Sequence, residues 1–301
     1  MDYHSRKEKE NCMISLVILL SFTTALAGLN YRPVVLMHGI LSSADGMNDI
    51  AKWLKESYPG IYVVSIEVGN GEDDSVLWPM NKQVDHFCQS VLADDHLKHG
   101  FNLLGYSQGS IIVRGAVERC SLPVFNLITL SGIHQGVFGV PYVLQLPFEF
   151  RELITKAAYE EPIQNAISVA NYWRDPEQLT RFLNDCQFLP DINNERSARN
   201  ETYRDNMLKL NAFVMTYTDI DEVVEPKQSG WFRGYLPGST QVETWNNSRQ
   251  FTEDLIGLRT LLEQGKLHTF ISNVSHVDVP HEPNRDFIFK NIIPFFNNTL
   301  E

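Results

Sequence analysis

Short apolar runs alternate with amphipathic segments over the first 130 residues of the chain. Continuous apolar runs are typical of strands buried on both faces of a parallel sheet. On this pattern we predict strands at 34–37, 61–66, 101–104 and 125–130. Apolar residues at helical spacing predict helices between them, at 50–58, 84–92 and 110–120. Strands that alternate with helices indicate βαβ units, so the pattern predicts an α/β fold around a mostly parallel sheet.

The alternation stops after residue 131. Residues 132–211 contain no strong strand pattern, and we expect them to form a helical insertion with helices at 149–160, 162–173 and 176–186. Each of these helices has a proline near its start, where proline is well tolerated. Two more strands, at 213–217 and 268–271, and a helix at 286–296 complete the pattern. The pattern contains no internal repeat, so we predict one domain over 28–301.

The first residues have the features of a secretory signal. An apolar run from Met13 ends in Ala25-Leu26-Ala27, the small residues of a signal-peptidase site, and basic residues precede it. The run is shorter than the roughly 20 residues that a membrane span needs. We therefore predict a cleaved signal peptide at 1–27 and no transmembrane anchor in the mature chain. An uncleaved anchor is the alternative, and Met13 is an alternative start.

The composition of the chain limits the classes of molecule that it can bind. The chain has 301 residues, 43% of them hydrophobic, with 25 basic and 37 acidic residues and a net charge of −12. This balance argues against binding of nucleic acid or of an anionic membrane through bulk electrostatics. Four sequons, at Asn200, Asn246, Asn273 and Asn297, agree with a secretory route, and we expect glycosylation there. Three cysteines remain after removal of the signal, enough for one intramolecular disulfide.

The strongest chemical signal is Gly105-Tyr-Ser-Gln-Gly109, which matches the G-x-S-x-G nucleophile elbow. A predicted strand precedes it and a predicted helix follows, as that turn requires. We therefore predict that Ser107 is the nucleophile of an acyl transfer. The developing oxyanion needs backbone donors, and we expect the N–H groups of Gln108 and, in the loop after strand 34–37, of Ile40. The neighbouring His38 fits a role in shaping that loop better than a role in proton transfer.

A serine nucleophile needs a base and an acid, in this fold class in the order serine, acid, histidine. Four acids follow strand 213–217, and we favour Asp221, then Asp219, over Glu222 and Glu225. We favour His276 as the base because it follows strand 268–271, with His281 as the alternative. His268 lies at the start of that strand, which is the end away from the serine. The remaining histidines lack further ligands nearby, so we expect no metal and no cofactor.

The sequence resembles the palmitoyl-protein thioesterases, and most closely their lysosomal type 1 branch, over nearly all of the mature chain. The similar segments are, beside the elbow, 59–67, 134–141, 172–176, 191–196, 229–232 and 292–295. The resemblance implies an α/β-hydrolase fold, the triad Ser107, Asp221 and His276, the oxyanion donors Ile40 and Gln108, and a disulfide between Cys88 and Cys120. The chain departs from the family pattern at Ser42 and Ser43, in a missing second cysteine pair, and at Ser110, which replaces a glycine.

The function implied is hydrolysis of long-chain acyl thioesters, releasing palmitate from S-acylated cysteines of proteins or peptides in the lysosome or outside the cell. An acyl-CoA thioesterase or an oxygen-ester lipase would use the same triad, and a non-catalytic binding protein is the remote alternative. A sixteen-carbon chain needs an apolar surface, which we expect the insertion to supply. The candidate lining residues are Val140, Val143, Leu144, Leu146, Phe148, Ile154, Ile163, Ile167 and Val169.

Overall fold

The computed structural model describes residues 30–139 and 157–300. The predicted signal peptide, 1–27, lies outside these residues. So do most of the predicted helix 149–160 and six of the candidate lining residues, from Val140 to Ile154. The statements below concern the described part of the chain.

Six parallel strands form one sheet in the order β2-β1-β3-β4-β5-β6. The strands are β1 (Val34–Met37), β2 (Val63–Ile66), β3 (Phe101–Tyr106), β4 (Val124–Leu130), β5 (Ala212–Thr218) and β6 (Leu267–Ser272). Each predicted strand is present at its expected place, and the α/β-hydrolase fold class is confirmed. Because β1 lies between β2 and β3, the chain reverses its direction of winding there. The loops that follow β1 and β3 therefore meet at the carboxyl edge of the sheet, where such folds bind ligands.

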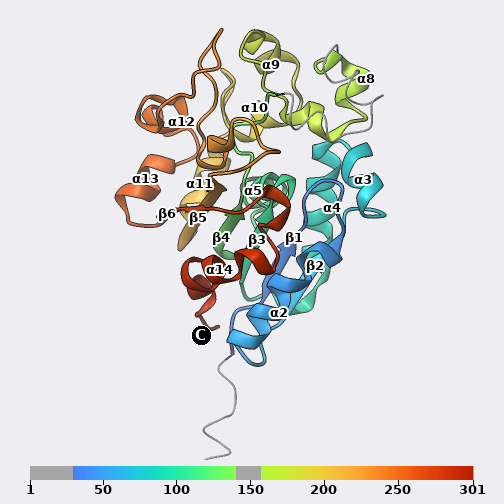
Figure 1. The fold of residues 1–301 in the computed structure, drawn as a ribbon, viewed down its shortest axis with the longest axis vertical. Helices are drawn as coiled ribbons and strands as arrows, with labels where there is room; N and C mark the ends of the chain where they lie inside the picture. Colours follow the sequence, from blue (N-terminus) through green and yellow to red (C-terminus); the bar gives the residue numbers. More distant parts are fainter. Residues whose placement is uncertain (1–29, 140–156, 301) are drawn as a thin grey trace, which may run out of the picture.

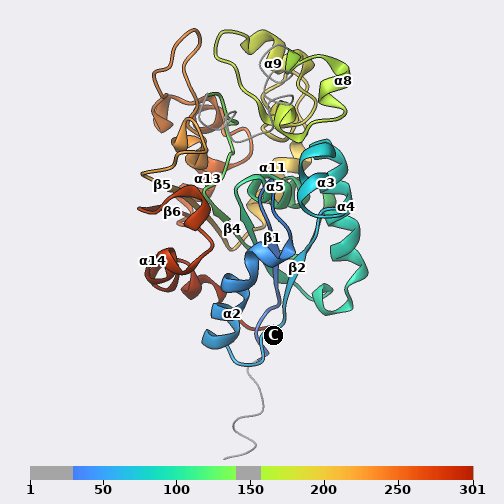
Figure 2. The ribbon, with the colours of Figure 1, turned by 45° about the vertical axis from the view of Figure 1, so that its right-hand side comes forward.

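Helices cover both faces of the sheet (Figures 1 and 2). Successive residues of a strand point to opposite faces. The helices outside the insertion are α2 (Asn48–Ser57), α3 (Glu72–Leu77), α4 (Met80–Ala93), α5 (Gln108–Cys120), α12 (Arg249–Thr252), α13 (Leu258–Glu263) and α14 (Arg285–Asn291). In β1, Val35 and Met37 pack with α4 and α5, whereas Val34 and Leu36 pack with α2 and α14. None of the helices in the described ranges is long and apolar enough to cross a bilayer.

Most of the insertion lies beyond the carboxyl edge of the sheet, at the top of Figure 1, whereas its last helix packs along α5. It contains α8 (Glu161–Gln164), α9 (Leu179–Asp185), α10 (Leu189–Ile192), α11 (Glu201–Leu208) and a 3₁₀ helix, η3 (Ser168–Tyr172). The prediction of one helix over 162–173 was wrong. The Gln164 side chain donates to the carbonyls of Ala158 and Ala170, and Asn171 donates to the Gln164 carbonyl. Side chains that bind the backbone in this way compete with a continuous helix.

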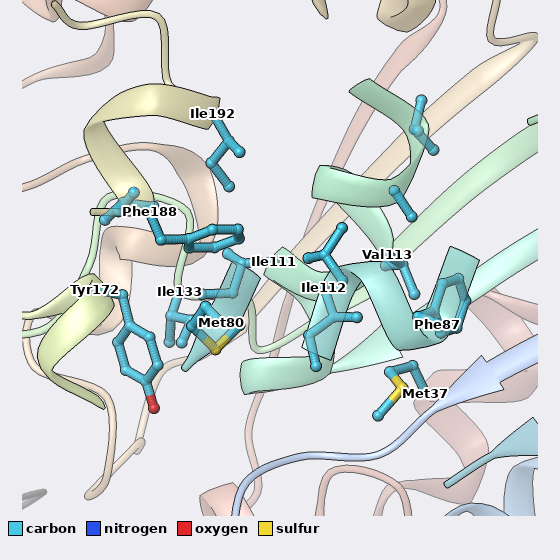
Figure 3. Close-up of a cluster of buried hydrophobic side chains, with 14 of the residues drawn as sticks. Met37, Met80, Phe87, Ile111, Ile112, Val113, Ile133, Tyr172, Phe188 and Ile192 are labelled. Atoms are coloured by element: carbon cyan, nitrogen blue, oxygen red, sulfur yellow. The ribbon is translucent and has the colours of Figure 1, made fainter. Parts of the chain in front are cut away.

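The insertion is joined to the sheet layer by a common apolar core. Figure 3 shows Tyr172, Phe188 and Ile192 of the insertion beside Ile111 and Ile112 of α5. Two of the candidate lining residues, Ile167 and Val169, belong to this core and are 3% and 0% exposed. Both pack inside the core that the insertion shares with the sheet layer. An acyl groove formed by the other candidates stays a prediction.

Candidate active site

Ser107 lies on a sharp turn between β3 and α5. Its backbone has φ 53° and ψ −123°, a strained conformation for a residue with a side chain. The turn also brings two backbones close together. A Cβ on Gly105 would lie 2.4 Å from the Gly109 carbonyl oxygen, and a Cβ on Gly109 would lie 2.4 Å from that of His38. The two glycines of the motif are therefore required by space rather than by their own dihedral angles.

Three predicted side chains meet at this turn. His276 Nε2 lies 3.0 Å from Ser107 Oγ, and His276 Nδ1 lies 2.8 Å from Asp221 Oδ2. A carboxylate only accepts hydrogen bonds, so Nδ1 carries the proton and Nε2 presents its lone pair to the serine hydroxyl. The second carboxylate oxygen of Asp221 accepts the N–H groups of Val223 and Val224, at 2.9 and 2.8 Å. These bonds fix the carboxylate, which is almost fully buried.

The competing acids and histidines lie elsewhere. Asp219 pairs with Lys227 at the surface, and Glu225 accepts a hydrogen bond from the Tyr235 hydroxyl. His281 lies 3.0 Å from Asp49, and the ring of His268 packs on Phe295. None of these groups bonds to Ser107.

Glu222 differs from Asp219 and Glu225, because its carboxylate accepts the backbone N–H of His276. The sequence pattern did not indicate this contact.

Ile40 lies in the loop after β1, and Gln108 is the first residue of α5; these two backbone segments meet beside Ser107. Gly39 allows their approach, because a Cβ there would lie 3.1 Å from the Ser107 Cβ. The Gln108 side chain donates to the Ser75 carbonyl at 2.8 Å and to Gln83 at 3.0 Å, and it accepts from the Tyr172 hydroxyl at 2.8 Å. The elbow is thus tied to α3, α4 and the insertion. The sequence pattern did not indicate α3 or these contacts.

His38 is buried, and its ring nitrogens bind the backbone of its own loop and of the loop after β2. Nδ1 donates to the Gly39 carbonyl at 2.8 Å, and Nε2 accepts the Val68 N–H at 3.2 Å. Burial lowers the pKa of His38, against smaller opposing effects of the Gly39 bond and of Glu67. A neutral ring with both nitrogens occupied fits the role in loop shaping that the sequence suggested.

The disulfide between Cys88 and Cys120 is present and joins α4 to the end of α5. Cys186 is a free, buried thiol, and burial raises its pKa to about 12. The four sequon asparagines, Asn200, Asn246, Asn273 and Asn297, are all exposed. Their exposure is compatible with glycosylation, which stays a prediction.

Comparison with known proteins identifies the family of this chain. A family model described as "Palmitoyl protein thioesterase" matches residues 33–276, a range that contains the elbow and both partners of Ser107. The chain belongs to the palmitoyl protein thioesterase family. A relative within the family, palmitoyl-protein thioesterase 3 of Dictyostelium discoideum, is 42% identical over 94% of this chain and 98% of its own.

Two further relatives span the family. Palmitoyl-protein thioesterase 1 of Caenorhabditis elegans is 34% identical over 88% of this chain and 93% of its own. The lysosomal thioesterase PPT2 homolog of Drosophila melanogaster is 34% identical over 94% of this chain and 98% of its own. Palmitoyl protein thioesterases of different named types are therefore similar to this chain along almost its whole length.

Proposed function

We propose that this hydrolase cleaves palmitoyl and similar long-chain fatty acyl thioesters from S-acylated cysteines of proteins or peptides. The observation that carries the proposal is the hydrogen-bonded chain from Ser107 through His276 to Asp221, located on a strained elbow. Membership of a family whose relatives are named palmitoyl-protein thioesterases supports the substrate class.

In the first half of the proposed reaction, Ser107 is acylated. Ser107 Oγ attacks the thioester carbonyl carbon while His276 Nε2 takes the hydroxyl proton, and Asp221 stabilises the imidazolium that forms. The tetrahedral intermediate collapses with cleavage of its carbon–sulfur bond. The proton on His276 passes to the departing sulfur, so the cysteine leaves as a thiol.

In the second half, water releases the fatty acid. His276 takes a proton from water, whose oxygen attacks the acyl-enzyme carbonyl carbon. The second tetrahedral intermediate expels Ser107 Oγ, which recovers its proton from His276. The products are palmitate and the free enzyme, and neither half needs a cofactor or a metal.

The N–H groups of Ile40 and Gln108 are the proposed oxyanion donors. Both belong to backbone beside Ser107, one within the loop after β1 and one at the first residue of α5. Within residues 30–139 and 157–300, the Ile40 N–H has no protein acceptor, and the Gln108 N–H has none outside α5. The two donors are therefore free for the negative charge that develops on the carbonyl oxygen.

For the compartment, we propose the lysosome, reached through the secretory route. The relatives from Drosophila melanogaster and Homo sapiens are named lysosomal thioesterases. A cleaved signal peptide at 1–27, glycosylation at the exposed sequons and the Cys88–Cys120 disulfide fit the same route, because disulfides persist in oxidising compartments.

A panel of three substrates separates this proposal from rival activities. We expect efficient turnover of a palmitoyl-cysteine peptide, and slower turnover of palmitoyl-CoA and of a triglyceride. Ser107→Ala should abolish turnover and labelling by a fluorophosphonate. Ser90→Ala, in α4, is the matched control and should retain both. Preference for the triglyceride would instead favour an oxygen-ester lipase, and preference for palmitoyl-CoA an acyl-CoA thioesterase.

Acyl length provides a second comparison on the same enzyme. Each methylene buried contributes about 0.8 kcal/mol, so kcat/KM should rise steeply from acetyl to palmitoyl thioesters if an apolar groove holds the chain. Equal turnover of acetyl and palmitoyl thioesters would favour a general esterase.

A further inference from the structure

The proposed base, His276, belongs to a short segment that has little regular structure of its own. His276 is the first residue of a three-residue 3₁₀ helix, η6 (His276–Asp278), that follows β6. The first N–H groups of any helix lack partners within it. Here Ser275, which precedes the helix, makes no capping bond to the helix backbone, although its hydroxyl donates to the Asp278 carboxylate at 2.6 Å. The position of His276 therefore depends on groups from other parts of the chain.

Two such groups hold the His276 backbone. The Tyr106 hydroxyl donates to the His276 carbonyl oxygen at 2.7 Å, and the Glu222 carboxylate accepts the His276 N–H at 3.1 and 3.2 Å. The Tyr106 ring also lies against the imidazole, with centroids 5.2 Å apart. Tyr106 directly precedes Ser107, and Glu222 directly follows Asp221. Each partner of the imidazole thus has a neighbour in sequence that binds the backbone of the same histidine.

We propose that Tyr106 and Glu222 are positioning residues that clamp the His276 backbone, so that the imidazole keeps its alignment between Ser107 and Asp221. The inference rests on the proposed function in taking His276 as the base. It adds a role for two residues that do not touch the reacting atoms. Because a misplacement of about 1 Å can reduce a rate about 100-fold, a backbone clamp has a direct effect on turnover.

The two halves of the clamp differ in strength. Tyr106 is 9% exposed, and a hydrogen bond in such an environment is costly to lose. Burial, followed by the nearby carboxylates of Asp221, Glu222 and Asp278, raises the pKa of Tyr106, so its hydroxyl keeps its proton. Glu222 is exposed, so water can replace part of its contact. We therefore expect Tyr106 to contribute more than Glu222.

The test compares variants that remove each contact with matched controls. Tyr106→Phe keeps the ring and removes only the hydroxyl. Glu222→Ala removes the acceptor of the His276 N–H, whereas Glu222→Gln keeps one acceptor oxygen. Tyr58→Phe is the control for the tyrosine, because Tyr58 also donates to a backbone carbonyl, that of Ile293, at 2.8 Å. Asp94→Ala is the control for the acid, because Asp94 accepts the His96 N–H in another 3₁₀ helix.

The readouts are kcat, KM, the melting temperature and the rate at which a fluorophosphonate labels Ser107. Labelling needs the serine and its base but not the acyl substrate. We expect Tyr106→Phe to lower kcat and the labelling rate about tenfold, with KM unchanged, and Glu222→Ala to lower both by a smaller factor. Glu222→Gln should recover most of the loss, and both controls should label at the wild-type rate.

Two results would overturn the clamp. One is wild-type labelling of both Tyr106→Phe and Glu222→Ala. The other is a loss of labelling that matches the loss in Tyr58→Phe at equal melting temperature. If Tyr106→Phe does not fold, the labelling rates of Glu222→Ala and Glu222→Gln decide the question, because Glu222 is exposed. A wild-type enzyme that is labelled at Ser107 but does not cleave palmitoyl thioesters would refute the proposed substrate and leave the clamp to be judged by labelling.

Discussion

Ser110 shows how a single side chain supports the nucleophile turn. This residue, in the first turn of α5, is fully buried. Its hydroxyl donates to the Ser107 carbonyl at 2.5 Å and accepts the Ile133 N–H at 3.3 Å. One hydroxyl therefore connects the elbow to the loop after β4.

We expect Ser110→Ala to lower the free energy of unfolding by about 1–3 kcal/mol, because the buried Ile133 N–H would lose its acceptor. Denaturant unfolding measures the change. The control is Ser90→Ala, whose hydroxyl donates to the His86 carbonyl within the same helix. Equal stability of the Ser110→Ala and Ser90→Ala variants would contradict the role assigned to this hydroxyl.

At the scale of residues, the side chains that could be predicted to meet are those that follow strand ends. Ser107, Asp221 and His276 come after β3, β5 and β6, and parallel strands bring their carboxyl ends to one edge of the sheet. Glu222 has the sequence context of a solvated charge, and its bond to the His276 N–H was missed. A side chain that binds the backbone of another loop leaves no periodic or spaced pattern in the sequence.

At the scale of elements, the strands were more predictable than the insertion. The central strands β1, β3, β4 and β5 are rich in apolar residues, and burial between two layers of helices decides their structure. The insertion instead depends on amide side chains, such as those of Gln164 and Asn171, that bind particular carbonyls. Those contacts end helices that apolar spacing alone would continue.

The disulfide gives a prediction at this scale, because it joins α4 and α5 across 32 residues. In the chain-entropy description, such a loop contributes about 3–4 kcal/mol, less any strain. The Cys88→Ser/Cys120→Ser double variant should therefore unfold at a clearly lower denaturant concentration than the wild type. Cys186→Ala, which removes a thiol without removing a cross-link, is the control. A double variant as stable as the wild type would show that the loop-entropy estimate fails here.

At the scale of the whole molecule, a buried polar cluster holds the insertion on the sheet layer. Arg114 of α5 pairs with Glu118 at 2.9 Å and donates to the Ile192 carbonyl at 3.1 Å and to Asn193 Oδ1 at 2.7 Å. Nearby, His134 stacks on Phe232 with ring centroids 4.7 Å apart. Removing one member of a buried ion pair is costly, because the other charge is left without its partner.

The same cluster predicts how stability responds to acid. Burial, followed by the charge of Arg114, lowers the pKa of His134 well below 6.5. The unfolded chain therefore binds this proton first, and the His134 contribution is lost as the pH falls below 6.5, by up to about 1.4 kcal/mol per pH unit. Glu118 has the opposite effect on the stability in acid. Burial raises its pKa from 4.5 to about 7 despite Arg114, so its contribution is gained as the pH falls from about 7 to 4.5.

The test is the free energy of unfolding between pH 7 and pH 4.5. We expect stability to fall more steeply with acid in Glu118→Gln than in the wild type, and less steeply in His134→Phe. Parallel curves for the three proteins would contradict the opposing contributions.

The hydrogen bonds of His276 also bear on how the protein folds during its synthesis. Its ring joins Asp221, 55 residues earlier, and Ser107, 169 residues earlier, and it follows the last strand of the sheet. During synthesis, the elbow emerges from the ribosome long before its base does. Contacts of such high sequence separation form late, because the intervening chain must first be ordered. We therefore expect the proposed nucleophile, Ser107, to be inactive in any chain that lacks His276, so that catalytic activity reports that the entire sheet has been assembled.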